Sequence, residues 1–431
     1  MSILHRVQDK GQSQQRNCKL FRVLQASESS DSTTRGSTPI RRFSQIVQFG
    51  NNSALLRSLI RKRPWLQAYC DFDRITGKPL LVGKLTGGCI NLLWTQYKCQ
   101  NFLEAKACRR RLKVLKNVPT GLQSNLISQI CSEDNVRIHN HYEGVASMCT
   151  KRGLIESLKT RFGESHRLMP DSFVFRENDA MNEFIGKLGV QTGKNIWIVK
   201  PGEFSNRGSG IKIVSSVPEV VDIIVSKITP TWVVQKYIQN PMLVEGRKFD
   251  IRSYGLITSE NGESHRSYFF SLAYARTASE TFSLNRLDDQ FCHLNNDAVQ
   301  KHAPNYGKAE PANKLTLEEV QKKTNGAFSA AQVLQDIQEM TRQVFLACAP
   351  SLNPRKIKHC FELVGFDFMV DATGKVWLIE ANTNPCLELV NSWLSYLIPT
   401  MIDGVLSLTV DPWLQDHNHK IPHKWVEIDM N

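Results

Sequence analysis

Apolar and polar residues alternate along two stretches near the C-terminal end of the chain, and this period of two predicts a β-hairpin. The stretches are Phe361–Asp371 and Val376–Ala381. The short connection between them contains Gly374, a residue typical of tight turns. We take Ala372–Lys375 as the loop, and this choice fixes which residues of the two strands lie opposite each other.

Three oxygen-bearing side chains fall on one face of this predicted hairpin. With that loop, Asp371 lies opposite Val376, and Asp367 lies opposite Glu380. Cross-strand neighbours share a face and lie about 5 Å apart. Asn382 is two residues beyond Glu380, so it shares that face if the strand continues. The side chains of Asp367, Glu380 and Asn382 are therefore predicted to converge.

Two carboxylates and one amide suit a hard divalent cation that also holds phosphate, Mg²⁺ above all. The alternative is that both acids are hydrated ends of surface strands. That alternative is disfavoured because the opposite face is expected to be apolar, with Phe366, Phe368, Val370, Trp377 and Ile379. The sequence therefore favours a metal site on this hairpin.

The same kind of pattern predicts both strands and helices elsewhere. The predicted strands are Ile46–Phe49, Asn91–Gln96, Pro170–Arg176, Ile196–Lys200, Ile211–Val214, Thr231–Gln239 and His265–Arg276. The predicted helical regions are Ser53–Lys62, Thr316–Cys348 and Asn391–Leu408. Thr316 and Glu319 form a capping box, and an apolar core stripe follows at Val333, Ile337, Met340 and Val344.

A glycine-rich loop of sequence PGEFSNRGSG, residues 201–210, separates two of these strands. The strand before the loop ends in Lys200. A strand–loop–strand hairpin of this kind lets backbone N–H groups close over phosphates, with a lysine as the counter-charge. It is not a Walker A loop, because GxxxxGK[ST] is absent and no helix follows directly. Many glycine-rich hairpins bind nothing, so the loop alone is weak evidence.

The sequence RKFDIR, residues 247–252, predicts a strand with an unusual polar face. Alternation places Lys248, Asp250, Arg252 and Tyr254 on one face, with Phe249 and Ile251 on the other. Two cations and one anion in a row suit an anion site. An edge strand with inward-pointing charges is the alternative.

Two further groups of polar residues could take part in binding. The predicted strand His265–Arg276 ends in Arg276, and Phe291–Lys301 contains the adjacent amides Asn295 and Asn296. The sequence Ile138-His139-Asn140-His141 is tempting as a metal site. Without further ligands nearby, however, a His-x-His pair is more often structural.

Net charge divides the chain of 431 residues into two unequal parts. Residues 1–120 contain 22 Lys and Arg against 6 Asp and Glu, a net +16, whereas the other 311 residues contain 32 against 35, a net −3. The cluster Lys106–Lys116 alone has six basic residues, which form either a hydrated helical face or, as we favour, a contact surface. A basic segment on a near-neutral body indicates an acidic partner, whether nucleic acid, an acidic protein surface or an anionic membrane.

Composition limits the class of protein further. A hydrophobic fraction of 41% and a charged fraction of 22% are typical of a globular protein, and no run of eighteen apolar residues predicts a membrane span. The 11 cysteines include no CxxC pair, which argues for a reducing compartment. Residues 1–40 are poor in apolar residues and predicted to be disordered. Asp9, Glu28 and Asp31 disfavour a mitochondrial transit peptide there.

We divide the chain into five parts on these grounds. They are a disordered tail (1–40), a small basic domain (41–118), a central domain (119–230), a C-terminal domain with the metal site (231–410) and a polar tail (411–431).

Several of these motifs occur together in a recognisable order. They are IWIVKPGEFSNRGSGI, WVVQKYIQNPMLVEGRKFDIRSY, YARTASE, HLNNDAVQKHAPNYG and GFDFMVD followed by VWLIEANTNPCLE. Over roughly residues 40–410 the chain resembles the tubulin–tyrosine ligase-like family. The resemblance implies an α+β, ATP-grasp fold with central and C-terminal mixed sheets plus the small basic N-terminal domain.

The resemblance also implies an activity. Members of the family join an amino acid to a glutamate side chain or chain terminus of tubulin, with ATP and Mg²⁺ as cofactors. A carboxylate attacks the γ-phosphate to form an acylphosphate, and the incoming amine then displaces phosphate. We expect an ATP-dependent ligase that adds glutamate or glycine to the acidic tails of tubulin.

Site residues follow from the matching positions. The resemblance implies a nucleotide site formed by Lys200, Arg207, Gly208, Gln235, Lys236, Tyr237, Ile238, Lys248, Phe249, Asp250, Asn295 and Asn296. Arg252 and Arg276 would be the catalytic pair, Arg252 at the phosphate and Arg276, helped by Lys314, at the carboxylate of the incoming amino acid. Asp367, Glu380 and Asn382 would hold Mg²⁺.

The sequence departs from the family pattern at three points. The glycine-rich loop is one residue longer than in many members, and HLNN stands where the family has HLTN. Glutamate-adding members have a basic residue after the metal hairpin, but residues 381–419 contain no Lys or Arg. This absence puts glutamate in doubt and keeps glycine open as the donor.

The expected partners are tubulin or microtubules and a free amino acid, with neither nucleic acid nor a membrane, and the expected state is a monomer. The expected location is the cytoplasm and cytoskeleton, including the cilium or basal body. We expect no separate C-terminal microtubule-binding extension. The alternatives are a microtubule-binding module without catalysis and an ATP-grasp ligase for a non-tubulin substrate.

Overall fold

The computed structural model describes most of the chain from residue 138 onward and parts of the segment before it. The described residues are 43–47, 52–63, 66–72, 79–81, 92–94, 138–164, 166–176, 179, 181–189, 196–202, 210–226, 229–414 and 423–430. The predicted tail (1–40), the basic cluster Lys106–Lys116 and most of the glycine-rich loop, with Arg207 and Gly208, lie outside these residues.

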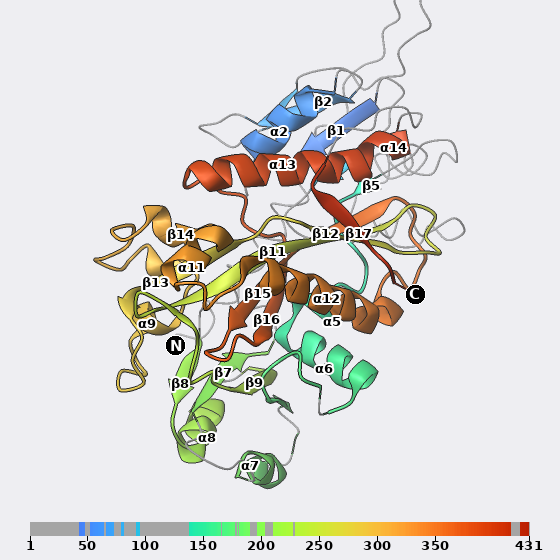
Figure 1. Cartoon of the computed structure of the whole chain (residues 1–431). Helices are drawn as coiled ribbons and strands as arrows, with labels where there is room; N and C mark the ends of the chain where they lie inside the picture. The colour runs from blue at the N-terminus through green and yellow to red at the C-terminus, as the bar shows by residue number, and fades with distance from the viewer. Residues whose placement is uncertain are drawn as a thin grey trace, which may run out of the picture.

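A large mixed sheet runs through the molecule (Figure 1). Its main path, in spatial order, is β14 (Lys314–Leu315), β13 (Tyr274–Thr281), β11 (Arg247–Ser259), β15 (Cys360–Val370), β5 (Ile138–His139), β4 (Leu92–Trp94), β1 (Phe43–Val47), β2 (Leu66–Phe72) and β3 (Pro79–Leu81). Pairing beside this path adds β10 (Leu243–Val244), β12 (Arg266–Phe270), β16 (Val376–Thr383) and β17 (Trp425–Ile428). The N-terminal strands thus join the sheet through the parallel pairing of β5 with β15.

A second, smaller sheet is antiparallel throughout. Its order is β6 (Ser172–Arg176), β9 (Thr231–Lys236), β7 (Trp197–Pro201) and β8 (Lys212–Val214). Helices α7 (Met181–Gly189) and α8 (Val217–Ser226) pack on it around Trp197 and Trp232. The sequence analysis placed a domain boundary between residues 230 and 231. In the structure this point lies directly before β9, which pairs with β6 and β7 of the small sheet.

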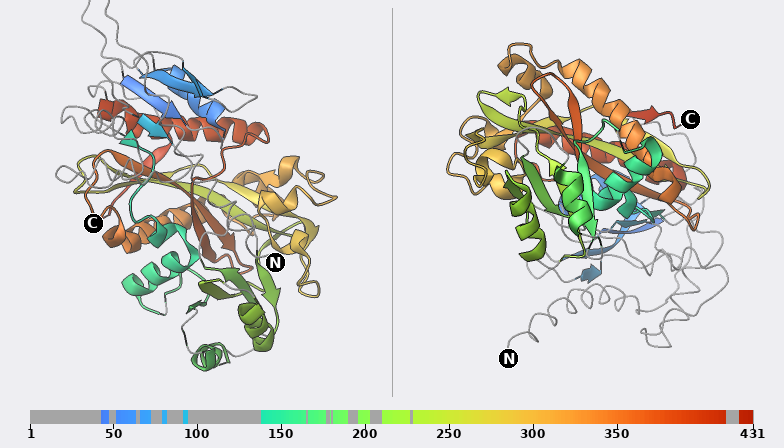
Figure 2. Two further views of the ribbon diagram at one scale, coloured as in Figure 1. Left: turned by 180° about the vertical axis from the view of Figure 1, so that it is seen from behind. Right: turned by 90° about the horizontal axis from the view of Figure 1, so that it is seen from below.

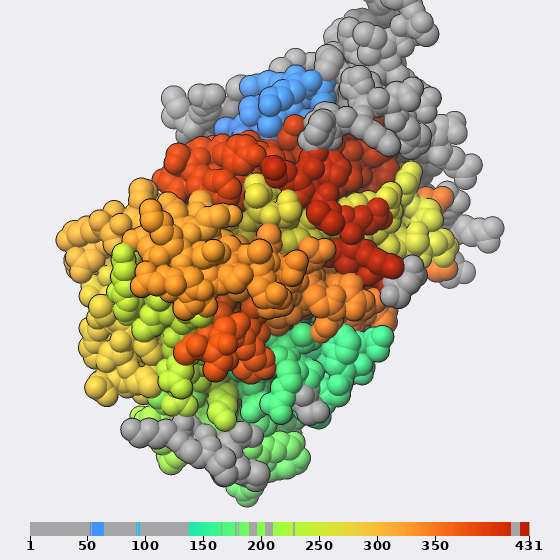
Figure 3. Space-filling model, viewed as in Figure 1, coloured from blue at the N-terminus to red at the C-terminus, as the bar shows by residue number. Residues whose placement is uncertain are grey.

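Helices cover both faces of the large sheet (Figure 2). One face packs against α5 (Ala146–Cys149), α6 (Lys151–Phe162) and α12 (Ala330–Cys348). The other packs against α13 (Ser392–Leu408) and α14 (Val410–Leu414), and α2 (Ser53–Arg61) packs against α13 beside strands β1 and β2 of the same sheet. The space-filling view shows residues of α13, in red, against residues of α2, in blue (Figure 3).

The short elements α9 (Gln290–His293), α10 (Asp297–Gln300), the 3₁₀ turn η2 (Pro311–Asn313) and α11 (Leu317–Lys323) lie near β13, and the 3₁₀ turn η3 (Ala349–Ser351) follows α12 directly. The predicted capping box of Thr316 and Glu319 is confirmed at the start of α11. The predicted single helical region is two helices, because residues 324–329 turn through Asn325 and Gly326 at positive φ. The predicted strand His265–Arg276 is likewise two strands, β12 and β13.

Among the described residues, one helical stretch is long and apolar enough, by length and composition, to cross a membrane. It is Ser392–Leu414, and 56% of its apolar window is buried inside the molecule. Leu397, Met401 and Val405 are fully buried against the sheet, so the stretch packs as the core helix of a folded domain.

Strands β11 and β15 explain how the large sheet makes both a core and a polar site. On the face toward α13, Tyr254 and Leu256 of β11 and Leu363 of β15 are apolar and buried. Along the same face, Arg252 and Asp367 follow at alternate positions, beyond the reach of α13. The charged half of this face lies opposite the small sheet.

Candidate active site

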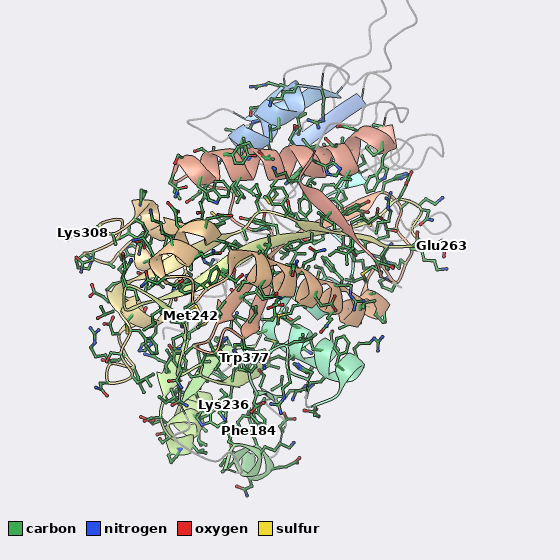
Figure 4. All side chains as sticks on the ribbon, in the orientation of Figure 1. Phe184, Lys236, Met242, Glu263, Lys308 and Trp377 are labelled. Atoms are coloured by element: carbon green, nitrogen blue, oxygen red, sulfur yellow. The ribbon has the colours of Figure 1, made fainter. Side chains whose placement is uncertain are left out.

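A cavity of about 980 Å³ lies between the two sheets. The predicted site residues that line it are Lys200, Gln235, Lys236, Tyr237, Ile238, Lys248, Asp250, Arg252, Arg276, Asn295, Asn296, Lys314, Asp367, Glu380 and Asn382. They come from positions up to 182 residues apart, from Lys200 on β7 to Asn382 on β16. In Figure 4, Lys236 marks the small sheet and Trp377 marks the hairpin of β15 and β16.

Phe249 is the exception among the described nucleotide residues. Its side chain is 1% exposed and lies in the core on the other face of β11, with its ring 6.0 Å from that of Phe328. The side chain of Phe249 therefore points away from the cavity. The alternation of polar and apolar residues along β11 predicted this orientation.

The three predicted metal ligands lie together. Asp367 on β15 is opposite Glu380 on β16, as predicted. Asn382 donates from Nδ2 to Glu380 Oε1 at 3.0 Å and to Asp367 Oδ2 at 3.4 Å. A rotation of the amide by 180° would turn its oxygen toward a cation instead. Lys151 Nζ, from α6, lies 3.8 Å from Glu380 Oε2.

The loop length and the register at the tip of the hairpin differ from those predicted, although Asp367 and Glu380 are paired as expected. Val370, not Asp371, lies opposite Val376, so the loop has one more residue than expected. A β-bulge between Asp367 and Phe368 takes up the difference, because Ile379 is the extra residue on β16.

The bulge also corrects the prediction that Trp377 and Ile379 lie on the apolar face opposite the acids. Ile379 lines the cavity. Trp377 is half-buried and donates from Nε1 to Asp371 at 2.8 Å. The core-facing residues of β16 are Val376, Leu378 and Ala381.

Two arginines and two aspartates form a buried array in the wall of the cavity. Arg252 lies opposite Asp367, and Asp250 lies opposite Arg276, in neighbouring strands. Arg252 contacts both carboxylate oxygens of Asp367 at 2.5 and 3.1 Å, and Arg276 contacts both of Asp250 at 2.6 and 2.8 Å. Arg276 Nη2 also lies 3.0 Å from Asp367 Oδ2. Burial alone would raise the pKa of Asp367, but the two guanidinium groups hold it well below its usual range.

Two buried lysines, in contrast, have neutral partners. Lys200 donates to Gln235 Oε1 at 2.9 Å, and Gln235 donates in turn to Ser172 Oγ at 2.8 Å. Lys248 donates to the carbonyl oxygen of His293 at 2.7 Å. Burial lowers the pKa of Lys200 to about 8 and that of Lys248 to about 8. Among the described residues, neither ammonium group has a hydrogen-bonded carboxylate, and this arrangement favours an incoming anion.

The adjacent amides have different surroundings. Asn295 is buried and donates from Nδ2 to the carbonyl oxygens of Lys248 and Arg276, both at 2.9 Å, so it ties β11 to β13. Asn296 lines the cavity, and its Oδ1 is buried with no hydrogen-bond partner among the residues that the structure describes. An unpartnered acceptor of this kind is costly unless a ligand or water supplies a donor or a cation.

Lys314 lies beside Arg276, because β13 and β14 pair at these two residues. Its ammonium contacts Asp297 Oδ1 at 2.8 Å and the carbonyl oxygen of Ala312 at 2.9 Å. Tyr306 also donates to Asp297 Oδ1, at 2.8 Å. Asp297 is part of the sequence HLNNDAVQK, but nothing local in the sequence indicates its partner.

The sequence analysis also missed a buried acid behind the metal ligands. Glu362 accepts from His141 Nδ1 at 3.1 Å, from the Tyr142 backbone at 2.9 Å and from the Thr383 hydroxyl. It therefore ties β15 to the end of β16, one residue past Asn382. His141 lines the cavity and is 2% exposed. In the part of the chain that the structure describes, no cluster of three His, Cys, Asp or Glu residues completes a metal site around the His139–His141 pair.

The residues present fit a nucleotide with a divalent cation. Buried cations with neutral partners suit phosphates, and the acids of the β15–β16 hairpin suit the metal. Apolar side chains from both sheets, Ile198 on one side and Met369 on the other, offer surfaces for a flat base. The buried and unpartnered oxygen of Asn296 is a further group that a ligand would satisfy.

The chain is similar to known proteins over more than half of its length. Residues 128–418 match the model of the Tubulin-tyrosine ligase family. Tubulin glycylase 3B of Tetrahymena thermophila is 34% identical over 226 residues, which cover 51% of this chain and 18% of that protein. The probable tubulin polyglutamylase TTLL2 of Mus musculus is 33% identical over 283 residues, 62% of this chain and 50% of that protein. The probable alpha-tubulin polyglutamylase Ttll1 of Tetrahymena thermophila is 30% identical over 237 residues, 51% of this chain and 55% of that protein.

Proposed function

Because the chain belongs to the tubulin–tyrosine ligase family, with an α+β fold of the ATP-grasp type, we propose that it is an ATP- and Mg²⁺-dependent ligase. It would add glutamate or glycine to glutamate side chains of tubulin tails and so form C–N bonds. The names of the relatives support tubulin as the substrate. The activity remains a proposal, because the chain spans only 18–55% of the lengths of these relatives.

The observation that carries this proposal is the pair of buried lysines with neutral partners. Lys200 and Lys248 are 5% and 6% exposed, and they come from different sheets. A buried ammonium without a carboxylate is unfavourable in the empty protein and becomes favourable when phosphate enters. These lysines share the cavity with three oxygen donors suited to Mg²⁺, Asp367, Glu380 and Asn382.

Each group then has a defined task. Gln235 fixes the ammonium of Lys200 toward the phosphates, and His293 fixes that of Lys248. Arg252 and Arg276 are held rigidly by Asp367 and Asp250, so their charges need little reorganisation during phosphoryl transfer. Asp367, Glu380 and Asn382 would hold Mg²⁺, which when bound neutralises charge on the phosphate oxygens.

The proposed reaction has two steps. The acceptor carboxylate takes the γ-phosphoryl group of ATP, an acylphosphate forms and ADP leaves. The amine of the donor amino acid then attacks the acyl carbon, phosphate leaves, and the amine loses a proton as the amide bond forms. Buried arginines and lysines suit this chemistry, because the negative charge of the transferred phosphoryl group is distributed over its three equatorial oxygens.

The basic N-terminal part supports an acidic acceptor. Residues 1–120 carry a net +16, whereas a small metabolite needs no such charge for recognition. Acidic tubulin tails are the complementary surface. We accordingly propose that the protein acts as a monomer in the cytoplasm, at the cytoskeleton and in the cilium or basal body.

Mass spectrometry of tubulin incubated with the protein, ATP, Mg²⁺ and labelled amino acids tests this function. We expect a mass increase on tubulin tails that requires ATP and disappears in the double variant Asp367→Ala with Glu380→Ala. An ATP analogue should raise the melting temperature only with Mg²⁺ present. Mg²⁺-dependent ATP binding without tubulin modification would point to a different acceptor, and absence of both would refute the proposal.

A further inference from the structure

Three charged side chains form a row across neighbouring strands at one end of the cavity. Asp250 on β11 lies opposite Arg276 on β13, and Arg276 lies opposite Lys314 on β14. All three line the cavity. Directly opposed residues lie about 5 Å apart, so Arg276 and Lys314 present adjacent positive charges. In the proposed function, these are the groups that receive the carboxylate of the donor amino acid.

The charge of Lys314 is already matched within the protein. Asp297 Oδ1 lies 2.8 Å from Lys314 Nζ and accepts a second hydrogen bond, also of 2.8 Å, from the hydroxyl of Tyr306. Burial would raise the pKa of Asp297, but Lys314 and Tyr306 hold it below its usual value. Asp297 is therefore ionised at neutral pH and offsets one of the two cations at this end.

The segment after the metal strand adds negative rather than positive charge. Glu388 lines the cavity, and its charge acts on Tyr306, the residue that binds Asp297. No Lys or Arg occurs in residues 381–419. Lys301 also lines the cavity, but it is exposed at the end of α10 and can remain hydrated. Arg276 is itself paired with Asp250, so the described residues of this row carry no surplus positive charge and oppose a second donor carboxylate.

We propose that Asp297 is a specificity-determining residue, which neutralises Lys314 and thereby selects glycine over glutamate as the donor. This inference rests on the proposed function. Glutamate has two carboxylates, and its side-chain carboxylate would meet Asp297 and Glu388 without a buried cation to balance them. Glycine has only the carboxylate that Arg276 receives.

Competition between two donors tests this inference. The full-length protein is incubated with tubulin, ATP, Mg²⁺ and equal concentrations of ¹⁵N-glycine and ¹³C-glutamate, and the mass added to tubulin is measured. We expect glycine to predominate in the wild type. In Asp297→Asn, we expect the ratio of glutamate to glycine incorporated to rise about tenfold, since one nearby negative charge is removed.

Matched variants separate charge from structure. Asp297→Glu keeps the charge and should keep the preference for glycine. Asp222→Asn removes an exposed acid on α8, remote from the charged row, and should leave the ratio unchanged. A merely structural role of Asp297 would lower incorporation of both donors together, without changing their ratio.

The outcomes are distinguishable. Predominant incorporation of glutamate by the wild type would overturn the inference but leave the proposed ligase intact. An unchanged ratio in a folded Asp297→Asn would overturn the role of Asp297. Absence of any incorporation by the wild type would refute the proposed function itself. Because the wild-type result stands alone, the inference remains testable even if Asp297→Asn does not fold.

Discussion

At the scale of single residues, Asp367 and Glu380 face each other across two strands but have very different surroundings. Asp367 is 4% exposed and binds two arginines. Glu380 has a side chain 30% exposed, and its nearest cation is 3.8 Å away. The proposed metal site therefore contains one buried acid whose ion pairs stabilise the fold and one partly exposed acid that contributes little to stability.

We predict that Asp367→Asn lowers the free energy of unfolding by about 3 kcal/mol, because it leaves buried arginine charge unbalanced. Glu380→Gln should change it by less than about 1 kcal/mol, since the pair with Lys151 is weak and partly hydrated. Both should abolish Mg²⁺-dependent stabilisation by ADP. Urea denaturation without nucleotide and melting curves with Mg²⁺ and ADP measure the two effects. Equal loss of stability in both variants would contradict the assignment.

The two buried lysines predict a dependence of nucleotide binding on pH. Burial lowers the pKa of both Lys200 and Lys248 to about 8, so each loses its charge as the pH rises through 8. We expect the Kd for Mg²⁺–ADP to rise about tenfold per lysine by pH 9. Lys248→Arg should remove its share of this rise, because arginine stays charged. Titration calorimetry at several pH values measures this Kd. A wild-type Kd that does not change between pH 7 and pH 9 would contradict the prediction.

The same shifts have the opposite effect on the protein without nucleotide. In the unfolded chain these lysines titrate near pH 10.4. Between pH 8 and about 10.4 the unfolded state therefore binds more protons than the native state. The contribution of Lys200 and Lys248 to stability should thus become less unfavourable as pH rises across that window, which denaturation at several pH values can measure.

Residue-level prediction from the sequence succeeded where side-chain direction follows from alternation. It placed Lys248, Asp250 and Arg252 on one face of β11 and Phe249 on the other. It could not find contacts such as His141 with Glu362, which are 221 positions apart, because neither residue signals its partner. Asp297 was overlooked for the same reason.

At the scale of elements, the hairpin of β15 and β16 depends on a glycine beneath the site. Gly365 lies opposite Asn382. A Cβ at this position would lie 2.9 Å from Pro385 Cβ and 3.2 Å from Arg252 Nη1. The strand can therefore pass below Arg252 only without a side chain at Gly365.

We predict that Gly365→Ala lowers kcat/KM by tenfold to about a hundredfold, because it displaces Arg252 by a fraction of an ångström. Gly374→Ala is the matched control on the same hairpin. Its φ of 89° makes the substitution strained, at a cost of about 1 kcal/mol, but no atom lies within 4 Å of the added Cβ. Steady-state kinetics should show a lower kcat/KM only for Gly365→Ala. Equal values of kcat/KM in the two variants would refute this prediction.

Element positions were predictable from the sequence to within a few residues, but strand register was not. The pattern located both strands of the hairpin, and the opposition of Asp367 and Glu380 is confirmed. The bulge at Ile379 and the longer loop depend on cross-strand packing, which a pattern along one strand does not contain. The break between α11 and α12 was missed although Asn325-Gly326 is a turn signal.

At the scale of the whole molecule, the N-terminal elements are held to the body by a buried ion-pair network. Arg63 follows α2 and contacts Asp411 at 2.6 and 2.8 Å and Asp403 at 2.9 Å. Asp403 lies on α13 and Asp411 on α14. This network links residues more than 330 positions apart and fixes α2 against the helices that cover the sheet.

We predict that Arg63→Ala destabilises the protein by about 3 kcal/mol and accelerates hydrogen exchange in α2, because it removes the two hydrogen bonds that Arg63 donates to the buried carboxylate of Asp411. Lys62→Ala, at an exposed neighbouring position, should change stability by less than about 0.5 kcal/mol. The affinity for Mg²⁺–ADP should stay the same in both, since the cavity lies on the other half of the sheet. Unchanged exchange in α2 would contradict the anchoring role of Arg63.

The bulge at Ile379 has a consequence for how related chains are compared. Because Ile379 has no residue opposite it, the pairing of Asp367 with Glu380 does not depend on this residue. A related chain could therefore lack the residue and still bring both carboxylates together. When two such sequences differ by one residue between the aspartate and the glutamate, the alignment gap belongs inside the second strand. Placing it in the turn would mismatch every position from Val376 to Leu378.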